Sequence, residues 1–565
     1  MQRRKFLKNV SLSGLGPLLL NGLPVNALAN TVGGLQSLAA TSTNDRVLVL
    51  IQLHGGNDGL NTLVPLHQYD QYVNLRSNIA LPRQGNRAVI PLDSTLEEQQ
   101  RLGLHPDMRS FKNLYDHGKA ALVQSVAYHN MNGSHFRSRD VWFMGGDYNS
   151  NYSSGWVGRY LDNVFPGYPD SYPSEGMPDP LAVEIGSRVS LTFHRSNGLP
   201  VAIALEDPER YYKLVSSVGG KLPGKEDGYY GEEIDYIKGI EQQANDYSQR
   251  IEQVFAKGKN SGVTYPIQYP YQTSNTLRKN DLAMPLKTIA RLLSGGSKTK
   301  IFLARLNGFD THANQAVRQD PTHGDHAALL YNLFSAVEAF QTDLRNLGIE
   351  DRVMTATFSE FGRRVRSNDS LGTDHGTAAP MFVFGKHVKP GVVGRNPDLF
   401  DLDDRDNLKQ QYDYRQVFGT LMADWLQAPP EAIRASKFAN FTTNEQKLPL
   451  VQGMRTPAPI PAPSPAPAPT PAPSPPPSGS FEIYHCYPNP AWEHTVVRYQ
   501  TDYILPLVVL TLRDENGESL IVEKRENIPP GKHEITLIVR NLPTGTYYYT
   551  MEAAGHEQTE RLQKV

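Results

Sequence analysis

Residues 301–385 constrain the fold of this chain most. They contain three short apolar runs, and one long helical pattern separates the first run from the other two. An apolar run at residues 301–306 ends in a polar turn. Across residues 329–344, apolar side chains then recur every three or four positions, which is typical of an amphipathic helix. Two further apolar runs occupy residues 353–358 and 381–384. Strands joined by a crossover helix predict an α/β fold, with a parallel sheet and helices on both faces.

Side chains that can bind a metal lie next to each of these predicted strands. Asp310 and His312 follow the first strand, Glu360 follows the second, and His375 precedes the third. Ligands bind at strand ends in α/β sheets, so we expect these four side chains to converge in one crevice. Two imidazoles and two carboxylates suit a divalent cation such as zinc or manganese. Each residue alone also has a structural interpretation, as a helix cap, a hydrogen-bonded loop histidine or an ion-pair partner of Arg363.

An earlier apolar run, residues 47–53, has the character of a central strand that is buried on both faces. It ends in a glycine-rich turn, residues 54–61, which includes His54 and Asp58. The turn can be purely structural, with its Asn and Asp side chains bonded to nearby amides. Because a buried strand ends directly in His and Asp, the sequence favours a place for both residues in the site.

Ser134 stands at the start of a predicted helix, after another strand candidate at residues 122–127. Serine at this position is often only an N-cap. The same position gathers free amides and the positive end of the helix dipole, which suits a nucleophile or a bound anion. Both interpretations of Ser134 remain open from the sequence.

Composition excludes several classes of protein. The formal net charge of −2 gives no reason to expect nucleic-acid binding. Cys486 is the only cysteine, so the chain cannot form an intramolecular disulfide. Beyond the N-terminal leader, no apolar run approaches the roughly 20 residues that a membrane span needs, so we expect no transmembrane span in the mature protein.

The first residues predict export. Arg3 and Arg4 begin a segment that resembles the twin-arginine signal, and a modest apolar stretch follows. The small residues Ala27 and Ala29 fit a cleavage site. The twin-arginine translocase is therefore the expected partner of the leader, with a general export leader or a basic tail as the alternatives.

The C-terminal part differs sharply in composition. Residues 457–477 contain twelve prolines, which favours an extended polyproline II spacer of roughly 65 Å at about 3.1 Å per residue. Short β patterns separated by turn signals follow, and they predict a small antiparallel sandwich. The expected order is an export signal, a spacer, an α/β domain, a Pro-rich linker and a β-sandwich, over residues 1–29, 30–45, 46–450, 451–480 and 481–565.

The motifs of this last segment resemble a type IX secretion sorting domain of the A type. They are residues 487–491 near its start, 514–517 in the middle and 542–547 late. The resemblance implies an immunoglobulin-like sandwich, the type IX secretion machinery as a partner, and delivery to the cell surface or secretion across the outer membrane.

The larger domain resembles an exported bacterial family of unknown function, which is itself similar in fold to the alkaline phosphatase and sulfatase superfamily. The motifs that carry this resemblance are residues 54–61, 133–136, 154–159, 310–312, 359–363 and 374–377. It implies one metal held by Asp310, His312 and His375. A second metal would lie near Glu360 and His54 or Asp58, but Phe361 stands where the superfamily has a histidine and His54 where it has an aspartate.

The resemblance also implies a chemistry. Ser134 would attack a phosphate or sulfate ester of a small molecule or glycan, and Arg363 would neutralise the equatorial oxygens. The Cys-x-Pro-x-Arg pattern of sulfatases is missing, so sulfate is the weaker choice. The departures at His54 and Phe361 favour an alternative function. In this alternative, the chain is a surface binding or scaffold protein that keeps the fold with a degenerate metal site.

Overall fold

The computed structural model divides into two compact units, residues 1–456 and 457–565. Apart from the short strands β1 (Leu19–Leu20) and β2 (Leu23–Pro24), the predicted leader and most of the spacer and linker lie outside the described residues. The described residues of the two units are 44–168, 171–206, 247–271, 273, 279–452, 481–483, 486–502, 505–514, 519–553 and 556–565.

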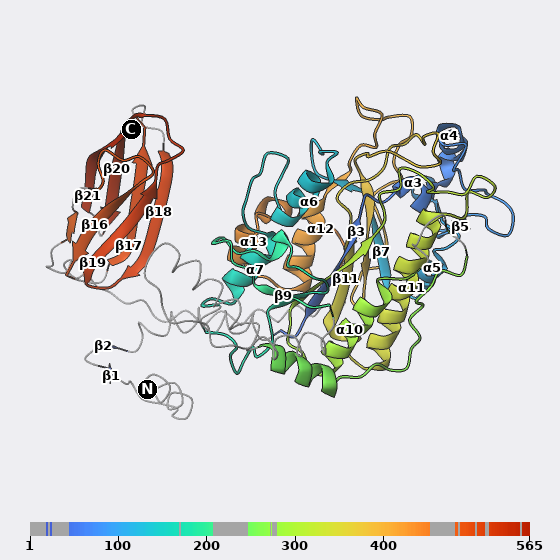
Figure 1. Cartoon of the computed structure of the whole chain (residues 1–565), viewed down its shortest axis with the longest axis horizontal. Coiled ribbons are helices and arrows are strands. Elements are labelled where there is room, and N and C mark those ends of the chain that lie inside the picture. Colours follow the sequence, from blue (N-terminus) through green and yellow to red (C-terminus); the bar gives the residue numbers. More distant parts are fainter. Residues whose placement is uncertain are drawn as a thin grey trace, which may run out of the picture. The chain divides into compact units, whose positions relative to one another are not determined.

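A nine-stranded sheet organises the described part of the first unit (Figure 1). Its strand order is β13-β7-β12-β11-β3-β10-β8-β9, and β14 pairs with β7. The strands are β3 (Val47–His54), β7 (Ala120–Ala127), β8 (Ala182–Glu184), β9 (Ala202–Ala204), β10 (Ile301–Asn307), β11 (Val353–Phe358), β12 (Ala379–Phe384), β13 (Gly391–Val393) and β14 (Tyr412–Asp413).

The direction of β12 differs from the predicted one, and it explains where the candidate site lies. The central strand β3 runs parallel to both of its neighbours, β10 and β11. The predicted parallel direction of the strand at residues 381–384 is wrong, because β12 runs antiparallel to β11 and β7. Since β12 runs the other way, the loop before it lies at the same edge of the sheet as the loops after β3, β10 and β11.

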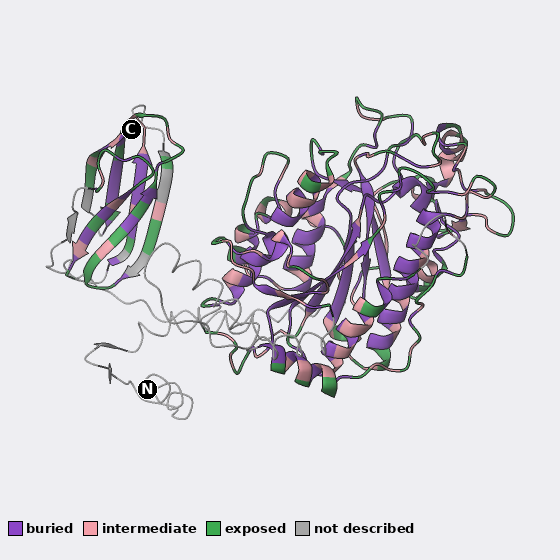
Figure 2. Cartoon of the chain, in the orientation of Figure 1, coloured by how far each residue is buried: buried purple, intermediate pink, exposed green. Residues whose placement is uncertain are grey.

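Helices cover both faces of the sheet, as predicted (Figure 1). Successive residues of β3 alternate between two cores, with Leu48 and Leu50 in one and Val47 and Val49 in the other. This alternation follows from the period of two in a β-strand. One core includes α6 (His135–Met144), α7 (Trp156–Val164), α12 (Tyr414–Thr420) and α13 (Pro430–Ala435), and the other includes α5 (Arg109–Asp116), α10 (Ala283–Ser294) and α11 (Asp325–Asn346). Figure 2 shows the strands between them as almost entirely buried.

Smaller elements surround this framework. The helices α3 (Gly59–Thr62) and α4 (Tyr69–Leu75) follow β3, and a three-stranded sheet is formed by β4 (Leu63–Pro65), β6 (Leu102–Leu104) and β5 (Ile90–Pro91). The short helical turns are η1 (Leu66–Gln68), η2 (Glu98–Gln100), η3 (Leu191–Phe193), η4 (Glu350–Arg352), η5 (Leu421–Trp425) and η6 (Ala439–Phe441).

The second unit is all-β, as predicted. Two antiparallel sheets enclose one core that includes Val497, Leu510, Leu537 and Met551. Their orders are β15-β16-β19 and β18-β17-β20-β21. The strands are β15 (Phe481–Ile483), β16 (His494–Thr501), β17 (Leu505–Arg513), β18 (Ser519–Ile528), β19 (Gly531–Ile538), β20 (Gly545–Ala553) and β21 (His556–Lys564). Within the described residues of both units, no helix has the length and apolar character that crossing a membrane requires.

Candidate metal centre

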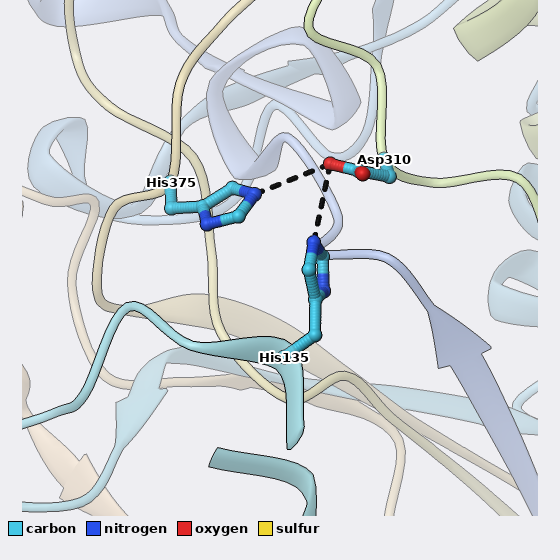
Figure 3. Close-up of side chains that lie close together, drawn as sticks. All are labelled: His135, Asp310 and His375. Atoms are coloured by element: carbon cyan, nitrogen blue, oxygen red, sulfur yellow. Dashed lines mark hydrogen bonds and ion pairs between the residues drawn. The ribbon is translucent and has the colours of Figure 1, made fainter. Parts of the chain in front are cut away.

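Side chains from two loops and from the first turn of α6 meet at the edge of the sheet where β3, β10 and β11 end. The ligand atoms of His135, Asp310 and His375 all lie within 4.8 Å of one another. Figure 3 shows both imidazoles pointing toward the Asp310 carboxylate. His135 Nε2 lies 3.3 Å and His375 Nε2 lies 3.2 Å from Asp310 Oδ1. The predicted approach of residues 310 and 375 is therefore present in the structure.

A third imidazole, that of His312, adjoins this group. His312 Nε2 lies 2.8 Å from His375 Nε2 and 3.3 Å from Asp310 Oδ1. The side chains of His312 and Asp310 are 46% and 49% exposed, so the centre is open to solvent on their side. Imidazole nitrogens together with a carboxylate form a donor set that suits zinc or manganese.

The far side of each imidazole is held by an oxygen acceptor. Nδ1 of His135 lies 3.0 Å from Glu360 Oε1, Nδ1 of His312 lies 3.0 Å from Asp374 Oδ1, and Nδ1 of His375 lies 2.7 Å from the Gly133 carbonyl. An oxygen acceptor at Nδ1 favours the tautomer that carries its proton there, as in metal-binding histidines. On the other side of the rings, the Nε2 atoms of all three histidines lie 3.2–3.3 Å from Asp310 Oδ1, and the hydrogen bond to Glu360 raises the pKa of His135.

Arg363 fixes the position of Asp310. Its guanidinium donates to Asp310 Oδ1 at 2.6 Å and to the carbonyls of Gly56, Phe309 and Thr373. Burial raises the pKa of Asp310, but the hydrogen bond and charge of Arg363 outweigh it and hold this pKa at about 2. The Arg363 side chain is 0% exposed, so its guanidinium faces Asp310 and backbone carbonyls in this structure, and its catalytic role stays a prediction.

Glu360 supports the centre from behind. Its Oε1 accepts hydrogen bonds from the Gly55 amide at 2.8 Å and from His135 Nδ1, while the buried Oε2 has no hydrogen-bond partner among the described residues. Gly55 has φ +124°, and a Cβ there would lie 2.2 Å from the backbone nitrogen of Asp310. Glycine therefore lets the β3 loop pack against the β10 loop. The structure places Glu360 as the hydrogen-bond partner of His135, outside the cluster of His135, Asp310 and His375 that could hold a metal ion.

Asp58, predicted as a possible ligand, lies in a buried ion pair. Arg76 Nη1 is 2.7 Å from Asp58 Oδ2, and both side chains are 0% exposed. Asp58 also accepts from Gln315 Nε2 at 2.5 Å and from the Leu60 amide at the start of α3. These donors occupy the carboxylate fully, so Asp58 is a structural residue, which corrects its predicted place in the site.

His54 and Phe361 border the centre. The His54 ring is stacked 6.2 Å from the His135 ring, and burial is the largest cause that lowers the pKa of His54. The Phe361 ring centroid lies 4.9 Å from that of His135 and 4.5 Å from that of His375. Phe361 is almost fully buried, so it forms an apolar wall against two of the imidazoles.

Ser134 occupies the N-cap position of α6, next to His135. Its side chain makes no capping hydrogen bond, and its backbone amide donates to Asn132 Oδ1 at 2.8 Å. Ser134 is exposed. The hydroxyl is therefore not used for capping, and Ser134 directly precedes His135 in the chain.

Sequence reasoning missed His135 as a ligand. The residue lies in the segment that singled out Ser134, but a histidine in the first turn of a helix carries no periodic signal. The proximity of residue 135 to the β10 loop depends on the packing of α6 over the sheet. The only signal was its place in the motif at residues 133–136.

Comparisons with known proteins define the two units further. Residues 286–418 match a family described as "Protein of unknown function (DUF1501)", and residues 485–564 match one described as "Secretion system C-terminal sorting domain". The chain thus combines a region similar to that uncharacterised family with a type IX sorting domain. This domain indicates secretion to the cell surface or the extracellular space through the type IX machinery, which confirms the predicted location. No curated protein matches the chain.

Three solved structures are similar to parts of the chain. A protein of the alkaline phosphatase superfamily from Vibrio parahaemolyticus is 10% identical, with 70% of this chain and 74% of that chain covered and a TM-score of 0.29. The PsFucS1 sulfatase from Pseudoalteromonas sp. is 12% identical, with 72% and 70% covered and a TM-score of 0.27. Dimeric latent PorU from Porphyromonas gingivalis is 16% identical, but only 15% of this chain and 9% of that chain are covered, with a TM-score of 0.14.

Proposed function

We propose that this secreted protein binds one divalent cation, zinc or manganese, through His135, Asp310, His312 and His375, and that it hydrolyses phosphate esters, with sulfate esters as the second choice. One observation carries the proposal. All three histidines hold their Nδ1 atoms against oxygen acceptors, so that their Nε2 atoms face Asp310 Oδ1.

Each residue of the centre has a defined task in this reaction. A cation bound there would supply Lewis-acid polarisation of a phosphoryl or sulfuryl oxygen. Ser134 Oγ would attack the phosphorus or sulfur atom and lose its proton to solvent, the departing oxygen would take up a proton from solvent to leave as the alcohol, and water would then hydrolyse the serine ester. The dipole of α6 favours negative charge at Ser134. Arg363 keeps the Asp310 carboxylate ionised and correctly placed.

We also propose the route of export. The leader would pass the inner membrane through the twin-arginine translocase, which carries folded proteins. The main domain could then bind its cation before export, and the sorting domain would deliver the loaded protein to the type IX machinery.

Metal analysis of the full-length protein tests the binding step. We expect about one equivalent of zinc or manganese in the wild type and a nearly complete loss in His375→Ala, because three donors hold a cation far more weakly than four. The exposed His117 supplies the control variant His117→Ala, which should keep the metal. A wild type without metal after supplementation with both ions would refute the proposal.

A chromogenic phosphate ester tests catalysis separately. Ser134→Ala should lose at least about 100-fold in kcat with an unchanged metal content, because it removes the nucleophile and no ligand. The exposed Ser94 gives the control Ser94→Ala, for which we expect wild-type turnover. Turnover in Ser134→Ala at the wild-type rate would show that another group attacks the ester.

One observation favours a second function, a surface scaffold that binds a cation without turnover. Phe361 packs on His135 and His375 where the superfamily places a histidine of a second metal, and the Arg363 side chain is 0% exposed. A metal-loaded wild type that hydrolyses neither phosphate nor sulfate esters would decide for the scaffold.

A further inference from the structure

The face of the sheet that packs against α6 changes from apolar to polar over its last two rows. Leu50 on β3 and Leu303 on β10 belong to the apolar core on this face. Two residues further along each strand, Gln52 pairs in register with Arg305, and the residues after them, His54 and Asn307, pair in the same way. Because side chains alternate in a strand, all of these polar residues share the α6 face.

Arg305 has unused hydrogen-bonding capacity in this polar strip. Its Nη2 pairs with Glu184 Oε1 at 3.0 Å and donates to Ser190 Oγ at 3.3 Å, and its Nε donates to Gln52 Oε1 at 2.8 Å. Glu184 is only 3% exposed and also accepts from the Ser190 amide and hydroxyl. The carboxylate is therefore satisfied by several donors. The Arg305 side chain is 30% exposed, and its Nη1 donates no hydrogen bond within the described residues.

Gln52 shows that an acceptor is missing beside Arg305. Gln52 is 0% exposed, and its Nε2 has no hydrogen-bond partner in the described part of the chain. A buried donor without an acceptor costs about 1–3 kcal/mol. An anionic oxygen bound at Arg305 would bring an acceptor to this end of the strip.

The strip adjoins the metal centre through His54. The His54 ring is stacked 6.2 Å from the ring of the ligand His135. Arg139 on α6 is a second cation that acts on His54 electrostatically, together with Arg305. A ligand group held at Arg305 would thus lie near a group held at the metal centre, on the same edge of the sheet.

We propose that Arg305, with His54 and Gln52 beside it, forms an anion subsite that binds a second anionic group of the substrate, a sulfate, phosphate or carboxylate next to the scissile ester. The claim that a scissile ester lies next to this anionic group rests on the proposed function. The claim that Arg305 binds an anion does not. A guanidinium recognises such oxoanions through two parallel hydrogen bonds. The substrate class is therefore a polyanionic ester, such as an oligosaccharide with several acidic groups.

Calorimetric titration of the full-length protein with inorganic sulfate, before and after chelation, tests the subsite. We expect one sulfate to bind the chelated wild type, and Arg305→Gln to weaken it about tenfold or more, because a charge-assisted bidentate contact is lost. Chelated wild type that binds no sulfate, or a folded Arg305→Gln protein with unchanged affinity, overturns the proposal.

Two variants control for the buried partner Glu184. The double variant Glu184→Gln with Arg305→Gln removes both charges of the pair and keeps the protein folded if the single variant unfolds, and it should lose sulfate equally. Arg250 has almost the same surroundings, 32% exposed and paired with the 2% exposed Asp179. Arg250→Gln should therefore leave sulfate affinity unchanged, and an equal loss there would overturn the proposal.

The outcomes also separate the subsite from the metal centre. Sulfate binding that depends on Arg305, in a wild type that takes up no metal even after supplementation with zinc and manganese, would support the subsite and reject the proposed hydrolase. A metal-loaded wild type whose sulfate affinity does not depend on Arg305 would reject the subsite and leave the hydrolase standing.

Discussion

Asp58 and Asp310 follow neighbouring strands at one edge of the same sheet, yet the structure gives them opposite surroundings. Asp58 is 0% exposed and pairs with Arg76, which is also 0% exposed. Asp310 is 49% exposed and, besides the buried Arg363, faces the three imidazoles of His135, His312 and His375. Both carboxylates are paired with an arginine, so the ion pair does not distinguish a structural residue from a functional one.

The difference lies in what the arginine leaves free. Arg76 and Gln315 together occupy both oxygens of Asp58, so no group from outside can approach it. Arg363 holds Asp310 from the protein side only and leaves the carboxylate open toward solvent. A fully buried ion pair such as Asp58 with Arg76 holds two segments of the chain together. A carboxylate such as Asp310, which is held on one side and exposed on the other, can still bind a ligand.

Of the changes that test this difference between Asp58 and Asp310, Arg76→Met should have the largest effect, on the free energy of unfolding. It leaves Asp58 charged and buried without its ion-pair partner, which typically destabilises a protein by about 3–5 kcal/mol. Denaturant unfolding of the full-length protein measures this change, and the metal content of the folded fraction should stay constant. Lys409→Met, which breaks an exposed pair with Asp401, is the control and should change stability little. Loss of metal in folded Arg76→Met would show that the two carboxylates are not independent.

An intermediate effect is expected for Glu360→Gln. This change removes the charge behind His135 but keeps an oxygen for the Gly55 amide, so metal affinity should fall by about 10- to 100-fold. Competition with a metal-sensitive dye measures this affinity. Asp374→Asn is the matched variant, because Asp374 supports His312 in the same way but is 55% exposed. A larger loss in Asp374→Asn than in Glu360→Gln would contradict the role of burial.

The smallest effect should appear on acidification. Burial raises the pKa of Asp58, but the charge of Arg76 and the hydrogen bond of Gln315 outweigh it, and the pKa is lowered. A lowered pKa stabilises the fold above the unfolded value near 3.9, and this contribution is lost as the pH falls through the folded pKa. The stability difference between the wild type and Asp58→Asn should therefore be constant from pH 5 to 7 and shrink below about pH 4. A difference that grows in acid would reject this account.

Much of the fold was predictable because it depends on local patterns. The buried run of β3, the amphipathic pattern of α11 and the alternating strands of the second unit each follow from the spacing of apolar residues. The direction of β12 did not follow, since its sequence is equally compatible with either direction. Only the packing of its ends against β11 and β7 determines that it runs antiparallel.

The site was predictable in part for the same reason. Asp310, His312 and His375 lie directly at strand ends, so their approach to one another follows from the order of the elements. The role of Asp58 depends on Arg76, eighteen residues away in the chain and brought close by the folding of α4. The role of His135 depends on how α6 packs, and no short sequence pattern encodes either contact.

The three imidazoles come from distant parts of the chain, at residues 135, 312 and 375. A single ion bound by all three would cross-link these segments, as a disulfide bond does. This chain has only one cysteine and cannot form an intramolecular disulfide. At a free-ion concentration 100 times the Kd, binding of such an ion stabilises the folded form by about 2.7 kcal/mol. Outside the cell, the supply of metal would then set how long the chain withstands proteolysis.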